Sequence, residues 1–156
     1  MGAIETSEDQ PLYTAVYRQR VDEKRRLQIP AKWRGDGPSS QLALALWPSG
    51  FDPHGCLMVF PVHLLKTLAQ SLRVGKPFND EETNAVRRFI GERADTAVID
   101  KAGRVVVPDA MAKAAGIGKE AVMVGMLDRF QIWEPKKYEA SRAGIEMVAA
   151  NAWQKF

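Results

Sequence analysis

A chain of 156 residues with 46% hydrophobic and 26% charged residues has the size and composition of one folded domain, which excludes a disordered or collagen-like protein. The single cysteine, Cys56, excludes an internal disulfide, and no stretch approaches the roughly 18 apolar residues of a membrane helix. Because residues 1–10 are acidic and lack a basic, apolar leader, we expect a soluble, cytoplasmic protein.

The first predicted elements are two strands around a charged turn. Residues 13–20 are expected to form a strand in which Tyr13, Ala15 and Tyr17 face one way. A turn at 22–25 and a short strand at 27–29 follow. Pro30 suits the start of a short helical turn that Gly35 ends, because proline lacks the donor that this position leaves unpaired. Residues 1–12 are expected to be a flexible N-terminal segment.

Two further strands and two helices complete the first part of the chain. Leucine alternates with alanine at 42–46, and 57–60 is a second apolar run, so both predict strands, with a loop at 48–55. A helix is predicted from Pro61 to Arg73, and then another for which Asn79 is the N-cap and Glu82 occupies the capping-box position. The later elements repeat this plan, with strands at 96–100 and 104–107, a helix from Pro108 to Gly116, two more strands, and a terminal helix from Pro135 that carries Tyr138, Ile145 and Val148.

The chain contains an internal duplication. Residues 21–30 and 99–108 share an apolar residue, aspartate, three residues, arginine, an apolar stretch and proline, aligned without a gap. The offset between them is 78 residues, since 100 − 22 = 78, and this is half of the chain. Two pseudo-symmetric units at 13–78 and 79–156 are therefore expected to share one strand-rich core flanked by helices, an α+β fold.

The repeated turn has a definite chemistry. Asp100 can accept hydrogen bonds from the turn backbone, Gly103 can adopt the positive φ of a hairpin with a bulge, and Arg104 is then held at the hairpin base. An ordinary turn with a surface ion pair would explain one copy. Two copies that both keep the arginine favour a binding surface, because a planar guanidinium can grip phosphate or a guanine edge with two donors.

Charge is unevenly divided between the two copies. From Arg18 to Arg34 there are seven basic and two acidic residues, and 7 − 2 gives a local charge of +5. This predicts a phosphate-binding face. Around the second copy, three basic and two acidic residues give only 3 − 2 = +1. We therefore expect the first half to make the stronger contact, supported by a basic surface of Arg18, Arg20, Lys32 and Arg34.

Other candidate sites have simpler explanations. His54, Cys56 and His63 are too few for a structural zinc site, so no metal and no cofactor is expected. Residues 116–119 lack the complete pattern of a phosphate loop and predict a helix end followed by a turn. The acids at 80–82 suit the start of a helix, the four tryptophans suit the core or a subunit contact, and Arg87 and Arg88 suit a solvated helix face. No nucleophile with a base is evident, so an enzyme with a small-molecule substrate is not expected.

The residues also resemble a known family. Both Asp-x-x-x-Arg turns, Ile29–Arg34, Val86–Phe89 and Val124–Trp133 occur in an order similar to that of MraZ proteins, bacterial transcription regulators built of two SpoVT/AbrB-like units. The likeness spans roughly residues 13–138. It implies two swapped-hairpin units in a strand-rich core of the double-split β-barrel type, and a ring-shaped homo-oligomer associated with the nucleoid. It also implies binding to double-stranded DNA at short direct repeats, with repression of the division and cell-wall gene cluster and of the protein's own promoter.

The resemblance implies which residues contact DNA. The motif positions are Asp22, Arg26, Asp100 and Arg104, and the charged turn residues Lys24, Arg25 and Lys101 are expected beside them. One position departs from the family, because Arg25 replaces the glycine that the second turn keeps as Gly103. A non-glycine residue at positive φ costs about 1 kcal/mol, so the first turn is expected to be strained or reshaped.

Two alternatives stay open from the sequence. In a ring-forming scaffold or protein-interaction module, the same arginines would pair across subunits. An antitoxin-like autoregulator would share the hairpin fold, although antitoxins usually have one unit and a disordered tail. No membrane association is expected in any of these cases.

Overall fold

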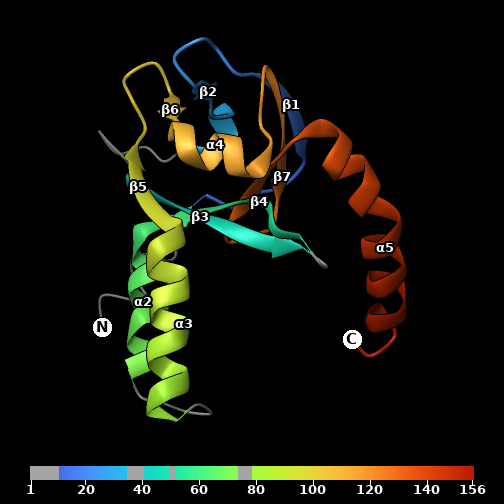
Figure 1. The fold of residues 1–156 in the computed structure, drawn as a ribbon. Helices are drawn as coiled ribbons and strands as arrows, with labels where there is room; N and C mark the ends of the chain where they lie inside the picture. The colour runs from blue at the N-terminus through green and yellow to red at the C-terminus, as the bar shows by residue number, and fades with distance from the viewer. Residues whose placement is uncertain (1–10, 35–40, 50–51, 74–78) are drawn as a thin grey trace.

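The computed structural model describes residues 11–34, 41–49, 52–73 and 79–156 (Figure 1). Within these ranges the protein is a mixed α+β fold with a strand-rich antiparallel sheet and four α-helices, as predicted. The elements are β1 (Val16–Arg20), β2 (Arg26–Gln28), the 3-10 turn η1 (Ala31–Trp33), β3 (Gln41–Ser49), β4 (Asp52–Pro61), α2 (Val62–Arg73), α3 (Asp80–Arg93), β5 (Ala94–Val98), β6 (Arg104–Val106), α4 (Asp109–Ala115), β7 (Glu120–Gly125), β8 (Phe130–Trp133) and α5 (Pro135–Trp153). Most of the proposed flexible segment at 1–12 lies outside the described residues.

The strands of the two halves pair with each other. A six-stranded antiparallel sheet has the order β1-β7-β8-β4-β3-β5, and β2 pairs with β6 in a second sheet. Thus β1 of the first half lies on β7 of the second, while β5 of the second half lies on β3 of the first. The strands of the two halves correspond as β1 to β5, β3 to β7 and β4 to β8. Exchanging these partners and reading the order from the other edge gives the same sequence of strands, so the sheet is pseudo-symmetric. The predicted strand at 13–20 pairs with β7 and not with the strand at 27–29; the local hairpin has a single bridge, between Val21 and Leu27.

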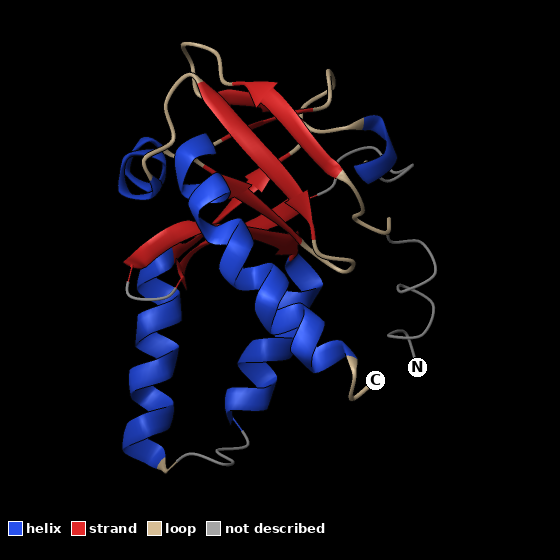
Figure 2. Cartoon of the chain, turned by 90° about the vertical axis from the view of Figure 1, so that its right-hand side faces the viewer, coloured by secondary structure: helices blue, strands red, loops and turns tan. Residues whose placement is uncertain are grey.

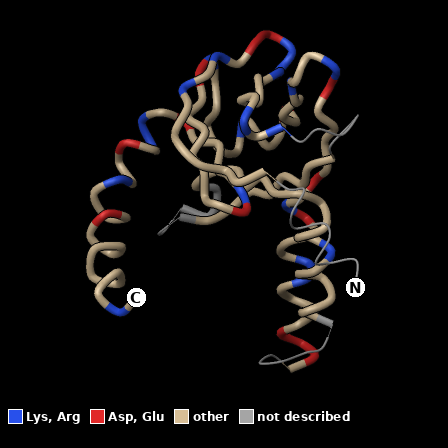
Figure 3. The backbone as a smooth tube through the Cα atoms, turned by 180° about the vertical axis from the view of Figure 1, so that it is seen from behind, with Lys and Arg blue, Asp and Glu red and all other residues tan. Residues whose placement is uncertain are grey.

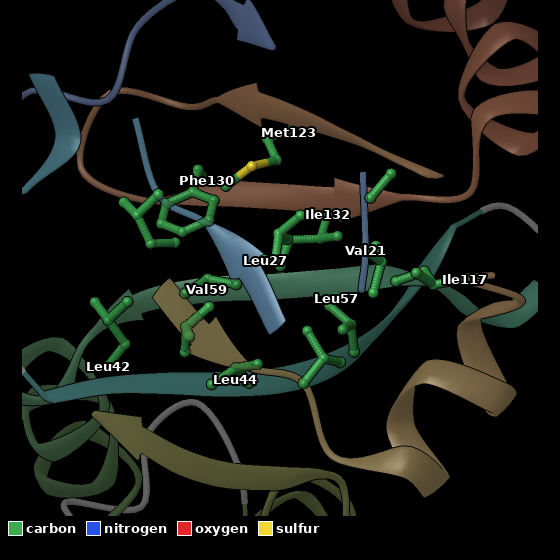
Figure 4. Close-up of a cluster of buried hydrophobic side chains, with 14 of the residues drawn as sticks. Val21, Leu27, Leu42, Leu44, Leu57, Val59, Ile117, Met123, Phe130 and Ile132 are labelled. Atoms are coloured by element: carbon green, nitrogen blue, oxygen red, sulfur yellow. The ribbon is translucent and has the colours of Figure 1, made fainter. Parts of the chain in front are cut away.

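The main hydrophobic core lies between the two sheets. Leu27 and Val105 face each other at the centre of the β2–β6 pair, and both are fully buried. Figure 4 shows Leu27 among side chains of the larger sheet, including Leu57 and Phe130. The alternation predicted at 42–46 is present, because the leucines of β3 enter this core while its alanines enter a separate cluster, packed with residues of α2, on the other face.

Helix ends follow the local sequence signals. Asn79 is the N-cap of α3: its side chain accepts from the backbone N–H of Glu82 at 2.8 Å, and its own N–H donates to the Glu82 carboxylate at 3.0 Å. This confirms the predicted capping box. Gly116 ends α4 with a φ of 75°, as expected from the stretch at 116–119. The α2 and α3 helices form a hairpin that projects from one end of the sheet (Figures 1 and 2).

Two predictions about the strands were wrong in detail. Ala15 has a φ of 76° and is exposed, so regular alternation begins only at Val16. The loop predicted at 48–55 is shorter, since β3 continues to Ser49 and β4 begins at Asp52 with an irregular register between them. Pairing between β3 and β4 extends the strands into a segment whose Pro, Gly and Asp content predicted a loop.

The terminal helix α5 extends away from the body of the protein (Figure 1). None of its residues is buried, and Ile145 and Val148 are 63% and 67% exposed. The tryptophans differ in exposure: Trp33 and Trp133 are buried in the body of the protein, whereas Trp153 on α5 is 72% exposed and stacks on Phe156. No helix within the described ranges is long and apolar enough to cross a membrane.

Candidate nucleic-acid interface

The first turn is organised by a single carboxylate. The Oδ1 atom of Asp22 accepts from the backbone N–H groups of Lys24 at 2.9 Å and Arg26 at 2.8 Å. Its Oδ2 atom accepts from Nε of Arg26 at 2.6 Å. The backbone closes the same loop, since Arg25 N–H donates to the Asp22 carbonyl at 3.0 Å. Asp22 therefore fixes both the turn and the direction of the arginine.

The second turn repeats these bonds atom for atom. Asp100 Oδ1 accepts from the N–H groups of Ala102 at 2.9 Å and Arg104 at 2.8 Å, and its Oδ2 accepts from Nε of Arg104 at 3.1 Å. Gly103 N–H donates to the Asp100 carbonyl at 2.9 Å, and Gly103 has the predicted positive φ of 81°. The duplication therefore preserves a side-chain geometry as well as a sequence.

This geometry leaves part of each guanidinium available. The hydrogen bond to aspartate uses Nε of Arg26 and of Arg104, so the two Nη groups of each side chain remain for another acceptor. Each carboxylate is held in its charged form: hydrogen bonding lowers the pKa of Asp22 and of Asp100, with the backbone N–H of the following motif arginine as the largest cause. An oriented, charged donor is suited to a phosphate or a base edge.

Both turns lie at one end of the molecule. Arg26 pairs with Val106 and Gln28 with Arg104 in β2–β6, so the turns are related by a pseudo-dyad at Leu27 and Val105. Figure 3 shows charged residues on both turns, at the end opposite α2 and α3. A single elongated ligand could therefore meet both arginines.

An open groove of about 850 Å³ lies beside the first turn. Its lining includes the acids Asp22 and Glu23, and five basic residues against these two acids give 5 − 2 = +3. Sequence reasoning missed one of the basic residues, Lys119, whose carbonyl accepts from the Val21 N–H at 2.9 Å. Its position beside the first turn depends on folding of the second half and has no local signal. The basic residues are Arg20, Lys24, Arg25, Arg26 and Lys119.

Arg25 is turned toward the second half of the chain. It has a positive φ of 62°, as the sequence led us to expect for this position. Its Nη2 atom lies 2.9 Å from a carboxylate oxygen of Asp109, and its Nη1 donates to the Ile117 carbonyl at 3.4 Å. The structure thus places this predicted DNA-contacting residue against α4.

The remaining predicted residues occupy different surroundings. Lys24 and Lys101 are exposed in the two turns, and Lys32 is exposed on η1. Arg18 is paired with Glu139 of α5 at 2.8 Å, which takes up part of the expected basic surface. Arg34 lies over the second turn, where its guanidinium carbon would be 2.8 Å from a Cβ built on Gly103.

The candidate metal residues do not form a site in the described part of the chain. There, no group of three His, Cys, Asp or Glu side chains could hold a metal ion. Cys56 is buried in the sheet, and burial raises the pKa of its thiol to about 12. The side chain of His54 lies outside the described residues.

Comparison with known proteins gives a consistent family. Residues 91–154 match the family model described as "MraZ protein, putative antitoxin-like". The "Transcriptional regulator MraZ" of Roseiflexus castenholzii is 30% identical over 144 residues, covering 92% of this chain and 96% of the relative. The proteins of the same name from Clostridium acetobutylicum and Nitrosospira multiformis are 30% and 31% identical, covering 88% and 86% of this chain and 93% and 86% of the relatives. With this identity over nearly its whole length, the chain belongs to the MraZ family.

Proposed function

We propose that this protein is a transcriptional regulator that binds double-stranded DNA through its two Asp-x-x-x-Arg turns. The observation that carries the proposal is the pair of identical aspartate–arginine arrangements, set around one pseudo-dyad at one end of the molecule. Each half of a DNA site can meet one oriented guanidinium. The related proteins that are named transcriptional regulators support the same function.

The turn residues have different roles in the proposed interface. Arg26 and Arg104 read base edges in the major groove, where a bidentate arginine prefers guanine, while Asp22 and Asp100 hold them in place. Phosphate contacts come from the exposed lysines of the turns and from the basic surface around the first turn. The residues of the proposed interface are Asp22, Lys24, Arg25, Arg26, Asp100, Lys101 and Arg104, supported by Arg18, Arg20, Lys32 and Arg34.

The strand order supports a more specific fold assignment. Each half gives its first strand to the other half, which is the arrangement expected of two swapped-hairpin units in a double-split β-barrel. The proposed units are 13–78 and 79–156. In such a fold the two turns cannot form independently, because each rests on strands from both halves.

The proposed target follows from the family resemblance. It is a set of short direct repeats in the promoter of the division and cell-wall gene cluster, which includes the protein's own gene. Binding there would repress transcription, and the protein would act in the cytoplasm in association with the nucleoid.

Several subunits would bind together in a ring. The exposed apolar residues of α5 and an apolar hollow between α2 and α3 support self-association. The hollow has a volume of about 190 Å³ and is lined by Leu65, Leu68, Leu72 and Ile90 among others. A ring that places several turns on several repeats would strengthen weak single contacts by avidity.

Fluorescence anisotropy tests the proposal directly. Labelled upstream DNA and a scrambled duplex are titrated with the protein at two salt concentrations. We expect preference for the upstream sequence and weaker binding at higher salt, because neutralised phosphates release counterions. Arg26→Ala should weaken promoter binding by about 1 to 3 kcal/mol, since it removes a base contact.

Arg88→Ala is the matched control. Arg88 is an exposed arginine of α3 paired with Glu92, at the opposite end of the molecule from the turns, so its loss should leave binding unchanged. Equal binding by folded Arg26→Ala and wild type would refute the mechanism. Absence of both sequence preference and salt dependence would favour the ring-forming scaffold, or an antitoxin-like interaction with another protein.

A further inference from the structure

The side chain of Arg25 connects the first turn to the opposite half of the chain. Its guanidinium reaches both the Asp109 carboxylate, 2.9 Å away, and the Ile117 carbonyl, 3.4 Å away. Its backbone carbonyl accepts from the Val107 N–H at 2.9 Å. A single turn residue therefore contacts the first residue of α4, Asp109, and the segments that flank this helix on either side.

The second turn achieves a similar contact in the opposite direction. Gly103 has no side chain, and the space above it is filled by the Arg34 guanidinium and the Gln28 amide. The Gln28 side chain also donates to the Ala102 carbonyl at 3.0 Å. At the second turn the side chains of Arg34 and Gln28 extend from the first half onto the turn. At the first turn the Arg25 side chain extends from the turn onto the second half.

These contacts suggest a role for the arginine that replaces glycine. An arginine at positive φ is strained, and glycine would relieve that strain. The strained residue nevertheless contacts both Asp109 at the start of α4 and the Ile117 carbonyl beyond its end, and the Asp109 carboxylate is also bound by Lys113 at 3.1 Å. The positive charge of Arg25 is therefore paired with the Asp109 carboxylate in the free protein.

We propose that Arg25 is a positioning residue, which holds the first turn on α4 through Asp109 so that Arg26 is presented to DNA in one direction. This inference rests on the proposed DNA-binding function. It differs from a direct contact in one respect: the acidic residue Asp109 then supports binding to a polyanion. A direct phosphate contact by Arg25 would instead be opposed by Asp109, which competes for the same guanidinium.

The two roles predict opposite signs for Asp109→Asn. If Arg25 positions the turn, this variant should weaken binding to upstream DNA about three- to tenfold, although it removes a negative charge. If Arg25 contacts phosphate, the freed guanidinium should strengthen binding, and this result would overturn the proposal. Glu92→Gln is the matched control, because it neutralises an acid paired with an arginine on α3, away from both turns.

Arg25→Gly completes a double-mutant cycle. It should weaken binding as much as Asp109→Asn, and the double variant should be no weaker than the single ones, because both remove the same contact. The dependence of affinity on salt should stay as in wild type. A slope reduced by about one for Arg25→Gly would indicate a lost phosphate contact and would count against positioning.

Hydrogen exchange without DNA separates this proposal from the proposed function. Because the Val107 N–H is bonded to the Arg25 carbonyl, its exchange should be at least about threefold faster in both single variants at the same global stability. Unchanged exchange in both variants would refute the positioning role even if DNA binding is found. Faster exchange together with no promoter binding by the wild type would instead refute the proposed function, and with it the role in presenting Arg26.

Discussion

The two turns have the same aspartate–arginine geometry and equivalent backbone bonds to the opposite half, but their side-chain connections run in opposite directions. Asp22 and Asp100 each accept two backbone hydrogen bonds and one from the Nε atom of arginine. At the position before that arginine, Arg25 reaches outward to α4, whereas Gly103 is covered by Arg34, the residue that follows η1. The hydrogen bonds that the two turns share involve the aspartate and the motif arginine, whereas the contact that differs involves the residue between them, Arg25 or Gly103.

This difference teaches where a duplicated unit can change. The aspartate is committed to backbone donors, so replacing it would alter the turn itself. The adjacent position only has to fill the space between the turn and the opposite half. At the first turn this space is filled by the Arg25 side chain, and at the second turn it is filled by Arg34 and Gln28 from the first half. Either the turn or the segment packed on it can therefore supply the side chain.

The largest effect should come from the residues that support both turns. Leu27→Ala should lower the free energy of unfolding by about 2 to 5 kcal/mol, because Leu27 is fully buried at the pseudo-dyad. Val105→Ala removes fewer carbon atoms from the equivalent position and should cost about 1 to 3 kcal/mol. Urea denaturation followed by circular dichroism measures both changes.

A valine of the same half provides the control. Val98 is 53% exposed on β5, so Val98→Ala should change stability by only about 0.5 kcal/mol. If Val105→Ala and Val98→Ala were equally mild, the two turns would not share a buried base. Their comparison as one pseudo-symmetric unit would then fail.

The next effect concerns DNA affinity at the two turns. Arg26→Ala should weaken promoter binding by about 1 to 3 kcal/mol, and Arg104→Ala should lie at the lower end of this range. The reason is the groove beside the first turn, where Arg20, Lys24 and Lys119 lie near Arg26 and add phosphate contacts. Anisotropy titrations of both variants measure the difference. A larger loss for Arg104→Ala would reverse the proposed order of the two contacts.

The sequence predicted the features that depend on neighbouring residues. The capping box of Asn79, the positive φ of Gly103 and the aspartate caps of the turns all involve residues within four positions of each other. The alternation of β3 was also predicted, since strand periodicity is local. These parts were enough to locate both candidate turns.

The sequence did not predict features that depend on distant residues. The pairing of β1 with β7 joins segments about 100 residues apart, and nothing within either strand specifies that partner. For the same reason the contact of Arg25 with Asp109 and the position of Lys119 beside the first turn were missed. The exposure of Ile145 was also missed, because helical spacing of apolar residues does not reveal whether a partner surface lies in the same chain.

A smaller effect should distinguish the positions before the two arginines. Gly103→Ala should cost about 1 to 2 kcal/mol of unfolding free energy, because a side chain there combines positive φ with a clash against Arg34 and Gln28. Arg25→Ala keeps the positive φ that the wild type already tolerates and loses a partly exposed ion pair with Asp109 and a long hydrogen bond to the Ile117 carbonyl, so it should cost less than Gly103→Ala. Thermal or urea denaturation compares the two. Equal costs would mean that the turns are packed alike.

The smallest effect is a change in proton affinity at the two aspartates. Carboxyl carbon NMR titration should give Asp22 and Asp100 a pKa below the ordinary 3.8, because hydrogen bonds favour their charged forms. In Arg26→Ala the pKa of Asp22 should rise only partly, since the largest cause is the backbone N–H of residue 26, which this substitution retains. The pKa of Asp100 should stay unchanged and serves as the internal control.

The sign of the linked stability follows from these lowered values. A carboxyl group whose pKa is depressed by folding stabilises the protein fully above its unfolded pKa, and this contribution is lost as the pH falls through the lower folded value. Both turns should therefore keep their geometry from about pH 5 upward, and DNA affinity should not titrate on their account between about pH 5 and 9. A complete return of the Asp22 pKa to 3.8 in Arg26→Ala would show that the arginine side chain, and not the turn backbone, holds the carboxylate.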